Sequence, residues 1–179
     1  MTQIGTVYGQ ALYSLAREES LDDTVLQQLQ LVQACFDAEP DYLRLLGSVS
    51  LSKPERCRLL DESLGATVHP YLLNFLKILV EKGKICYFSQ CVTAYQQEYY
   101  RDHNILPVTA VTAIALSQPQ AQRLTEKLAN ITGKEILLSN QVDASLLGGV
   151  RLDYDGKQLE DSIAQRLQNV RQLLKNTVL

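Results

Sequence analysis

The pattern of apolar residues changes once along this chain of 179 residues, at the stretch Ile105-Leu106-Pro107. Before that point, apolar residues recur at the spacing of amphipathic helices and no strand signal interrupts them. After it, residues 108–115 are rich in valine, isoleucine and threonine, which is typical of a β-strand. The change predicts an α+β protein with an N-terminal six-helix bundle over residues 1–104, followed by a small C-terminal α/β domain over residues 105–179.

The first unit is expected to contain six helices joined by short connections. Ser20 is expected to begin the second helix, because serine is a frequent N-cap and Asp22 and Asp23 suit the positive end of a helix dipole. Ser52 and Glu55 form the S-x-x-E pattern of a capping box. The predicted helices cover residues 2–19, 20–39, 41–46, 52–64, 70–82 and 84–104.

The second unit alternates strands and helices. Ser117 and Gln120 form another capping box, which opens a helix over residues 117–132 after the first strand. A second strand is expected over residues 135–139, and Asp155-Gly156 predicts a tight hairpin between residues 150–154 and 157–160. A final helix is expected from Ser162, with an apolar stripe of Ile163, Leu167, Val170 and Leu174.

Composition and charge exclude several classes of protein. A formal net charge of −3 argues against a nucleic-acid binder, which usually presents a strongly basic face. No apolar run approaches the roughly 20 residues that a membrane span needs. The N-terminus lacks a basic or apolar leader, since its first basic residue is Arg17. We therefore expect a soluble protein of the cytoplasm or an organelle, with no direct membrane insertion.

No group of residues with catalytic spacing stands out. The two histidines, His69 and His103, accompany no G-x-S-x-G motif. Gly148-Gly149 lacks the lysine and the hydroxyl residue of a phosphate loop, so we interpret residues 143–149 as a turn. We expect a protein that is not an enzyme and needs no cofactor or metal, with a nucleotide-dependent activity as a distant alternative.

Two clusters with possible metal ligands have simpler interpretations. The four cysteines form no C-x-x-C pair and are expected to be buried apolar thiols: Cys35, Cys57, Cys86 and Cys91. The acidic residues around the hairpin do not follow a calcium-loop register. Among them, Asp161, or Ser162 next to it, is expected to cap the final helix.

Two helix faces leave alternatives open. The stripe of the first helix is rich in small residues and could face the core or form a groove for an amphipathic helix: Gly5, Gly9, Ala11 and Ala16. The polar side of the final helix could be a solvated face or a docking face for an acidic partner: Arg166, Arg171 and Lys175.

Five separated motifs resemble the δ subunit family of F-type ATP synthases, whose mitochondrial counterpart is the oligomycin-sensitivity-conferring protein. Residues 8–16 (YGQALYSLA) resemble Y-A-x-A-L-F-x-L-A, and residues 79–85 (LVEKGKI) are similar to L-x-x-N-G-R-L. Residues 111–117 (VTAIALS) resemble V-x-S-A-x-x-L-S. Residues 142–150 (VDASLLGGV) match V-D-x-S-L-I-G-G, and residues 161–167 (DSIAQRL) follow them as D-G-S-x-x-x-R-L does. Lys84 and the pair Glu160-Asp161 depart from these patterns.

The resemblance implies a non-catalytic stator subunit that links the catalytic head to the peripheral stalk and resists rotor torque. It implies one copy per complex, at the cytoplasmic face of a bacterial plasma membrane or at a chloroplast thylakoid. The helical unit would receive N-terminal helices of α subunits in a groove, and the second unit would contact the stalk b subunits. Carried over, the groove residues are Tyr8, Ala11, Leu12, Leu15, Phe75, Ile78 and Leu79.

The remaining motif residues, assigned to the family pattern and the stalk side, are Lys84, Asp143, Gly148, Gly149, Asp161, Ser162, Arg166 and Leu167. The alternative interpretation of the whole chain is a cytoplasmic adaptor whose helical bundle binds an unrelated amphipathic helix.

Overall fold

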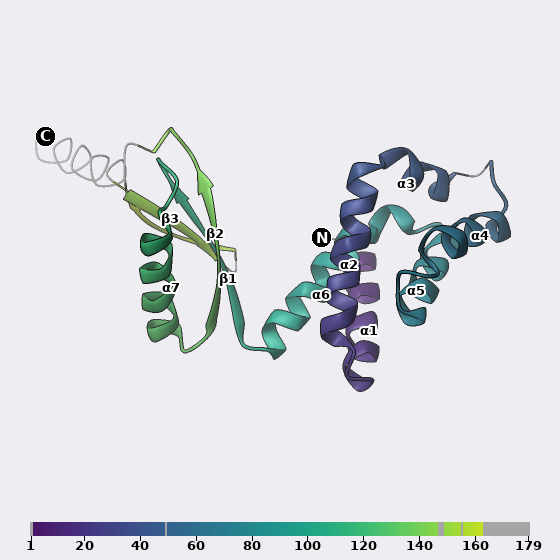
Figure 1. The fold of residues 1–179 in the computed structure, drawn as a ribbon, viewed down its shortest axis with the longest axis horizontal. Coiled ribbons are helices and arrows are strands. Elements are labelled where there is room, and N and C mark those ends of the chain that lie inside the picture. Colours follow the sequence, from purple (N-terminus) through teal and green to yellow (C-terminus); the bar gives the residue numbers. More distant parts are fainter. Residues whose placement is uncertain (1, 49, 147–148, 155, 163–179) are drawn as a thin grey trace, which may run out of the picture. The chain divides into compact units, whose positions relative to one another are not determined.

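The computed structural model describes residues 2–48, 50–146, 149–154 and 156–162. The chain divides into two compact units, Met1–Tyr99 and Tyr100–Leu179. The division lies five residues before the change in sequence pattern. Tyr99 still packs on the helical core, whereas the Asn104 side chain donates to the Gly133 carbonyl of the second unit. Helices fill the first unit and a mixed sheet forms the second, which confirms the α+β class (Figure 1).

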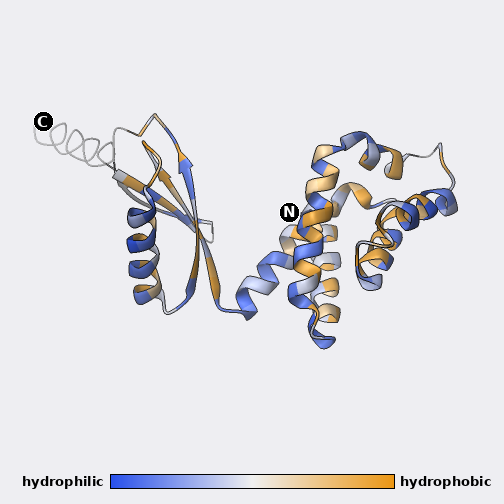
Figure 2. Ribbon diagram, in the orientation of Figure 1, coloured by the Kyte–Doolittle hydropathy of each residue, from blue (hydrophilic) through white to orange (hydrophobic). Residues whose placement is uncertain are grey.

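The described part of the first unit holds helices and no strand. They are α1 (Gln3–Glu18), α2 (Asp22–Ala38), α3 (Pro40–Gly47), α4 (Lys53–Leu64), α5 (Pro70–Glu81), the 3₁₀ helix η1 (Ile85–Tyr87) and α6 (Phe88–Asp102). Their apolar sides turn toward one another (Figure 2). One core cluster draws residues from every α-helix, among them Leu12, Leu29, Leu46, Leu60, Leu76 and Tyr95.

The expected start of the second helix at Ser20 is wrong. Ser20 has a left-handed backbone with φ of 56°, and its N–H donates to the Arg17 carbonyl at 3.0 Å. The next N–H, of Leu21, donates to the Ala16 carbonyl at 2.8 Å. These two bonds form a Schellman motif, so Ser20 terminates α1 and α2 begins at Asp22.

The expected continuous helix over residues 84–104 is also wrong in its first turn. Residues Ile85–Tyr87 form a 3₁₀ turn before α6 begins at Phe88. At the other end, α6 stops at Asp102, and Asn104 takes a left-handed φ of 56° before the first strand. An asparagine tolerates this conformation better than most residues, which explains the sharp change from helix to strand.

Both predicted capping boxes are confirmed. At α4, the Ser52 N–H donates to Glu55 Oε2 at 2.8 Å, and the Glu55 N–H donates to Ser52 Oγ at 3.4 Å. These bonds lower the pKa of the Glu55 carboxyl. In the second unit, the Ser117 N–H donates to Gln120 Oε1 at 2.9 Å, where α7 (Gln118–Thr132) begins. Each box satisfies amide groups that the first helical turn leaves unpaired.

The second unit is a four-stranded sheet with α7 on one face. Strands β1 (Ile105–Thr112), β2 (Glu135–Val142), β3 (Gly149–Tyr154) and β4 (Lys157–Ser162) lie in the order β2-β1-β3-β4. β1 and β2 are parallel and joined through α7, while β3 and β4 form the predicted antiparallel hairpin. Val108, Ala110, Ile136 and Leu152 form the core beneath α7.

Two strands differ in extent from expectation. β1 covers 105–112 rather than 108–115, because its parallel pairing with β2 begins at Ile105. The Thr112 hydroxyl then donates to the Ile114 carbonyl at 2.7 Å and turns the chain away from the sheet. β2 runs on to Val142 rather than Ser139, since it pairs with β1 over its whole length.

Asp161 and Ser162 lie in β4, paired with Val150 and Gly149. The prediction that the final helix begins at Ser162 is therefore wrong, because the ladder of hydrogen bonds with β3 extends through that residue. The stripe of that expected helix, Ile163, Leu167, Val170 and Leu174, lies outside the described residues, as do Arg166, Arg171 and Lys175.

Candidate partner-binding surfaces

Helices α1 and α5 lie side by side in the helical unit. The rings of Tyr8 and Phe75 meet edge to face, with centroids 6.5 Å apart. Below them, Leu12 and Leu79 are buried, and Phe75 is only 7% exposed. Three of the seven predicted groove residues therefore form a buried floor, and Tyr8 is half-buried above it.

The other three predicted residues are exposed beside that floor. Leu15 of α1 is 39% exposed and Ile78 of α5 is 45% exposed, while Ala11 is also exposed. Val7, which the sequence interpretation missed, is 57% exposed. Its spacing of four residues from Ala11 and eight from Leu15 was the available signal. We call Val7, Tyr8, Ala11, Leu15 and Ile78 the α1–α5 apolar surface.

The four small residues of α1 lie in two different environments: three are buried and one is exposed. A Cβ atom at Gly9 would lie 2.4 Å from the Cys91 carbonyl oxygen, and one at Gly5 would lie 2.6 Å from Gln90 Cβ. Both glycines thus allow α6 to approach the α1 backbone closely, and Ala16 is buried as well. Only Ala11 is exposed, so the core-facing interpretation is right for three of the four small residues.

The Lys84 motif ends α5. Gly83 has φ of 66°, its N–H donates to the Val80 carbonyl at 3.1 Å, and the Lys84 N–H donates to the Leu79 carbonyl at 2.7 Å. This is a second Schellman motif. Lys84 Nζ lies 5.8 Å from the centroid of the Tyr87 ring, within reach of a cation–π contact. The turn therefore fixes the last residues of α5, next to Ile78.

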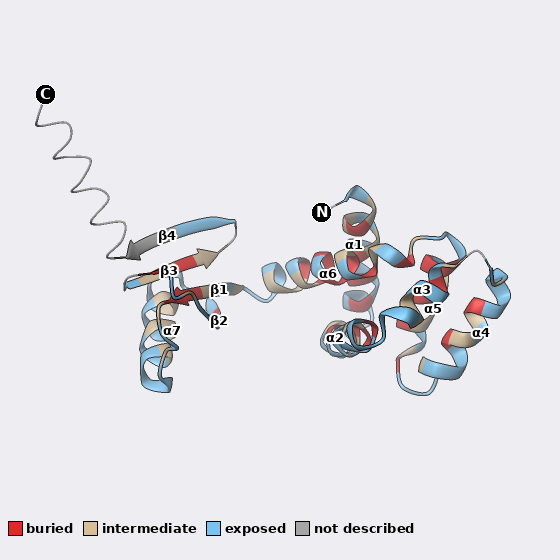
Figure 3. Cartoon of the chain, turned by 90° about the horizontal axis from the view of Figure 1, so that it is seen from above, coloured by how far each residue is buried: buried red, intermediate tan, exposed pale blue. Residues whose placement is uncertain are grey.

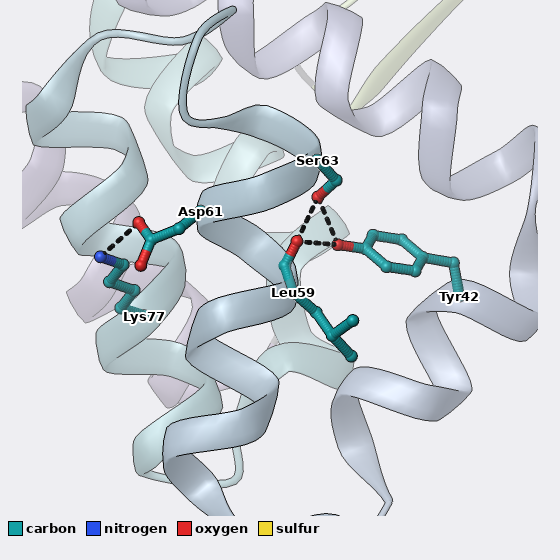
Figure 4. Close-up of polar contacts among 5 residues, drawn as sticks. All are labelled: Tyr42, Leu59, Asp61, Ser63 and Lys77. Atoms are coloured by element: carbon teal, nitrogen blue, oxygen red, sulfur yellow. Dashed lines mark hydrogen bonds and ion pairs between the residues drawn. The ribbon is translucent and has the colours of Figure 1, made fainter.

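Polar contacts hold α4 against its two neighbours (Figure 4). Lys77 of α5 pairs with Asp61 of α4 at 2.6 Å. Tyr42 Oη of α3 lies 2.6 Å from Ser63 Oγ of α4 and donates to the Leu59 carbonyl at 3.3 Å. Burial raises the pKa of the Tyr42 hydroxyl, which keeps it a donor. α5 is thus braced on the α4 side.

In the second unit, the D-x-S motif is a closed turn. Asp143 Oδ1 accepts from the Ser145 N–H at 2.9 Å and from its hydroxyl at 2.6 Å, and these bonds lower the pKa of the Asp143 carboxyl. The Asp143 N–H donates to the Thr112 carbonyl at 2.9 Å. Gly149 follows with φ of 93°, which favours glycine. Gly148 lies outside the described residues, as do Arg166 and Leu167.

The cysteines and His69 have structural rather than chemical environments. The expectation of four buried thiols is wrong, because Cys35 and Cys86 are exposed and Cys57 is half-buried. Burial raises the pKa of Cys91 to about 11, so this thiol stays protonated. His69 is the N-cap of α5, where its Nδ1 accepts from the Tyr71 N–H at 3.3 Å.

None of the helices in the described part of the chain combines the length and apolar character that crossing a bilayer requires. The described residues thus present an exposed apolar surface on two neighbouring helices, and a small sheet whose Asp143 turn is closed by hydrogen bonds.

Comparisons with known proteins agree with this description. Residues 4–174 match the family model described as ATP synthase delta (OSCP) subunit. The chain is 30% identical over 170 residues to "ATP synthase subunit delta" of Synechococcus elongatus, and this alignment covers 94% of each of the two chains. It is 31% identical over 176 residues to the protein of the same name from Lactobacillus gasseri, covering 97% of this chain and 96% of the other.

A solved structure shares the fold. A chain of the mitochondrial ATP synthase hexamer of Toxoplasma gondii aligns with a TM-score of 0.77 at 18% identity, covering 97% of this chain and 98% of its own.

Proposed function

We propose a use for each surface of this chain, starting from one premise: the chain belongs to the ATP synthase delta (OSCP) subunit family. It is a non-catalytic subunit of an F-type ATP synthase, in the stator that links the catalytic head to the peripheral stalk. A stator must resist the torque of the rotor, so that proton flow is coupled to ATP synthesis. Which residues hold each partner is our proposal.

The helical unit, taken as one bundle of six helices over residues 1–104, docks on the head. We assign the α1–α5 apolar surface to an amphipathic N-terminal helix of an α subunit. The observation that carries this assignment is the row of exposed apolar side chains on two neighbouring helices, above the Tyr8–Phe75 contact. An amphipathic helix that lays its apolar side on such a surface is a common mode of recognition.

The energetic contribution of this surface is concentrated in a few side chains. Burying a large aliphatic side chain completely is worth about 1.5–3 kcal/mol. Leu15 and Ile78 are each less than half exposed, so each can add roughly 1 kcal/mol when a partner covers it. The floor of Leu12, Phe75 and Leu79 is buried already and serves to hold the surface rigid. A preorganised surface loses little entropy on binding, which favours a long residence time.

The second unit, residues 105–179, contacts the b subunits of the peripheral stalk. Support comes from its closed turns, since Asp143 is fixed by Ser145 and by β1. The other motif residues of this unit are Gly148, Gly149, Asp161, Ser162, Arg166 and Leu167, whereas Lys84 belongs to the family motif that ends α5 in the helical unit. One copy of the chain per complex would be held at the periphery of the membrane, at the cytoplasmic face of a bacterial plasma membrane or at a thylakoid.

A binding titration tests the docking surface. The full chain is added to a catalytic head stripped of its own δ subunit, and the complex is followed by sedimentation. We expect Ile78→Asp to weaken binding tenfold or more, because about 1.4 kcal/mol corresponds to a factor of ten and a buried carboxylate is costly.

Leu31→Asp on α2 is the matched control, since Leu31 is 48% exposed and Ile78 45%. It makes the same change of charge on another helix and should bind like the unmodified chain. Equal binding of both variants and the unmodified chain would contradict the assignment.

A further inference from the structure

The strand β2 lies at one edge of the sheet, and its outer side is open in the described part of the chain. β1 pairs with β2 over all eight residues, in a parallel register without a bulge. Six of the eight residues of β2 are exposed, whereas only Pro107 is exposed in β1. α7 lies against a face of the sheet, where it packs on the side chains of Ile136 and Leu138, and it leaves the edge open (Figure 3).

The hydrogen bonds of β2 determine which of its backbone groups face the open side. The Glu135 N–H donates to the Asn104 carbonyl at 3.1 Å, and the Asp143 N–H donates to the Thr112 carbonyl at 2.9 Å. The ladder with β1 therefore uses the odd-numbered residues of β2, because successive residues of a strand alternate in direction. The outward N–H and C=O groups belong to Ile136, Leu138, Asn140 and Val142. No described residue forms a hydrogen bond with these backbone groups.

The sheet protects its open backbone elsewhere but not along β2. Edge strands usually carry charged residues, proline or a bulge, because unpaired backbone groups attract other chains. Where β1 extends beyond its pairing with β3, it has Pro107, which lacks an N–H. β4, at the other end of the sheet order, has three charged residues among six. In β2 the only charged residue is Glu135, at its first position, and Leu137 and Val142 are each about half exposed.

We propose that β2 receives an extended segment of a partner chain as a fifth strand, and that this partner is a peripheral-stalk subunit. The outward N–H and C=O groups are spread over roughly 20 Å, and another strand presents acceptors and donors at the same spacing. The segment is uncharged in its middle, because a charge beside Leu137 or Val142 would lose water. The identity of the partner rests on the proposed function, in which the second unit contacts the stalk.

Neither a helix nor a second copy of this chain suits the edge. The backbone groups of a helix already bond to one another, so a helix cannot satisfy the outward groups of β2. A second copy related by two-fold symmetry would add its β2 antiparallel, and the register that pairs all the outward groups places Glu135 opposite Asp143 at both ends. Like charges directly opposite each other destabilise a strand pair. The same two carboxylates favour a segment with basic rather than acidic residues at its ends.

Amide hydrogen exchange tests the pairing residue by residue. The full chain is measured alone and with the purified peripheral-stalk subunits of an F-type ATP synthase. We expect the outward amides of Leu138 and Val142 to exchange at least tenfold more slowly with the stalk than without it. The amides of Leu137 and Gln141 bond to β1, so they should exchange slowly in both samples and verify that the sheet is folded.

Substitutions at the edge test the same pairing through the affinity for the stalk. Val142→Pro removes an outward N–H without removing a bond to β1, and we expect it to weaken stalk binding roughly fivefold or more. The matched control, Val142→Thr, keeps the N–H and should bind like the unmodified chain. If Val142→Pro loses the sheet, Leu137→Lys places a charge on the edge instead and should weaken binding. Its control is Gln158→Lys, at an exposed position of β4.

The possible results separate this inference from the proposed function. If the stalk binds but Leu138 and Val142 exchange as fast as in the chain alone, strand addition is overturned and the stalk contact stands. If the stalk does not bind the folded chain, both are overturned. Slow exchange of the two amides in the chain alone would assign the edge to a second copy, and slow exchange with the catalytic head alone would assign it to the head. Either result overturns the proposal.

Discussion

The two units differ in how completely they bury their own apolar residues. In the helical unit, Leu29, Val32, Leu72 and Leu76 are all inaccessible to solvent, and α1 approaches α6 through two glycines. In the α/β unit, the core beneath α7 is small and α7 itself contributes only half-buried side chains. The contrast teaches that the helical unit has a large, densely buried core, whereas the described residues of the α/β unit bury only a small one.

The largest effect that separates the two units is expected from core truncation. Leu76→Ala should destabilise the helical unit by about 2–5 kcal/mol, because it opens a cavity in a fully buried site. Leu128→Ala in α7 should cost about 1–2 kcal/mol, because Leu128 is only half-buried. Hydrogen exchange followed separately in each unit measures both losses of unfolding free energy. Equal losses would contradict the difference in burial between the two units.

A smaller effect is expected where backbones meet. Gly9→Ala should cost about 1–3 kcal/mol, since the new methyl group would meet the Cys91 carbonyl and Ala94, both on α6. Gly133→Ala, at the end of α7, should cost about 1 kcal/mol from its left-handed φ of 66° alone, because a Cβ atom placed there would meet none of the described atoms within 4 Å beyond its chain neighbours. Chemical denaturation of each variant tests the order. A harmless Gly9→Ala would show that α1 and α6 are not tightly packed.

Much of the fold could be predicted because local chemistry determined it. Both capping boxes, the Asp155-Gly156 hairpin and the change from helix to strand after Asn104 follow from short stretches of sequence. Ser20 was misassigned because serine suits an N-cap, and only the bonds from Ser20 and Leu21 back to α1 show that it is a helix stop. The prediction that all four cysteines are buried was wrong for a similar reason, since the exposure of each side chain depends on the neighbouring helices.

The candidate site could be predicted only in part. Tyr8, Ala11 and Ile78 do lie on two adjacent helices, but the sequence could not separate the buried floor of Leu12 and Leu79 from the exposed rim. The sequence also could not show which element packs on Gly9, because the residue that approaches it, Cys91, is far away in the chain. Packing partners distant in sequence decide these questions, and a single sequence does not reveal them.

The smallest expected effect concerns two exposed carboxyls, one in each unit. Serine hydrogen bonds hold the pKa of Glu55 and of Asp143 below their ordinary values. Their contribution to stability is therefore present above the unfolded pKa, near 4, and is lost as pH falls through the folded pKa. Ser52→Ala and Ser145→Ala should each raise the pKa of the matching carboxyl, as followed by NMR titration. An unchanged pKa in either variant would contradict the hydrogen bonding at that turn.

Coupling between the head and proton transport tests the central claim most directly. Membrane vesicles stripped of the native head and δ subunit are reconstituted with a head and with the unmodified chain, Ile78→Asp or Leu31→Asp. We expect every preparation to hydrolyse ATP, but proton pumping to be lost or strongly reduced with Ile78→Asp alone. Full pumping with Ile78→Asp, at a concentration where the unmodified chain is just saturating, would contradict the account that the α1–α5 apolar surface ties this subunit to the head.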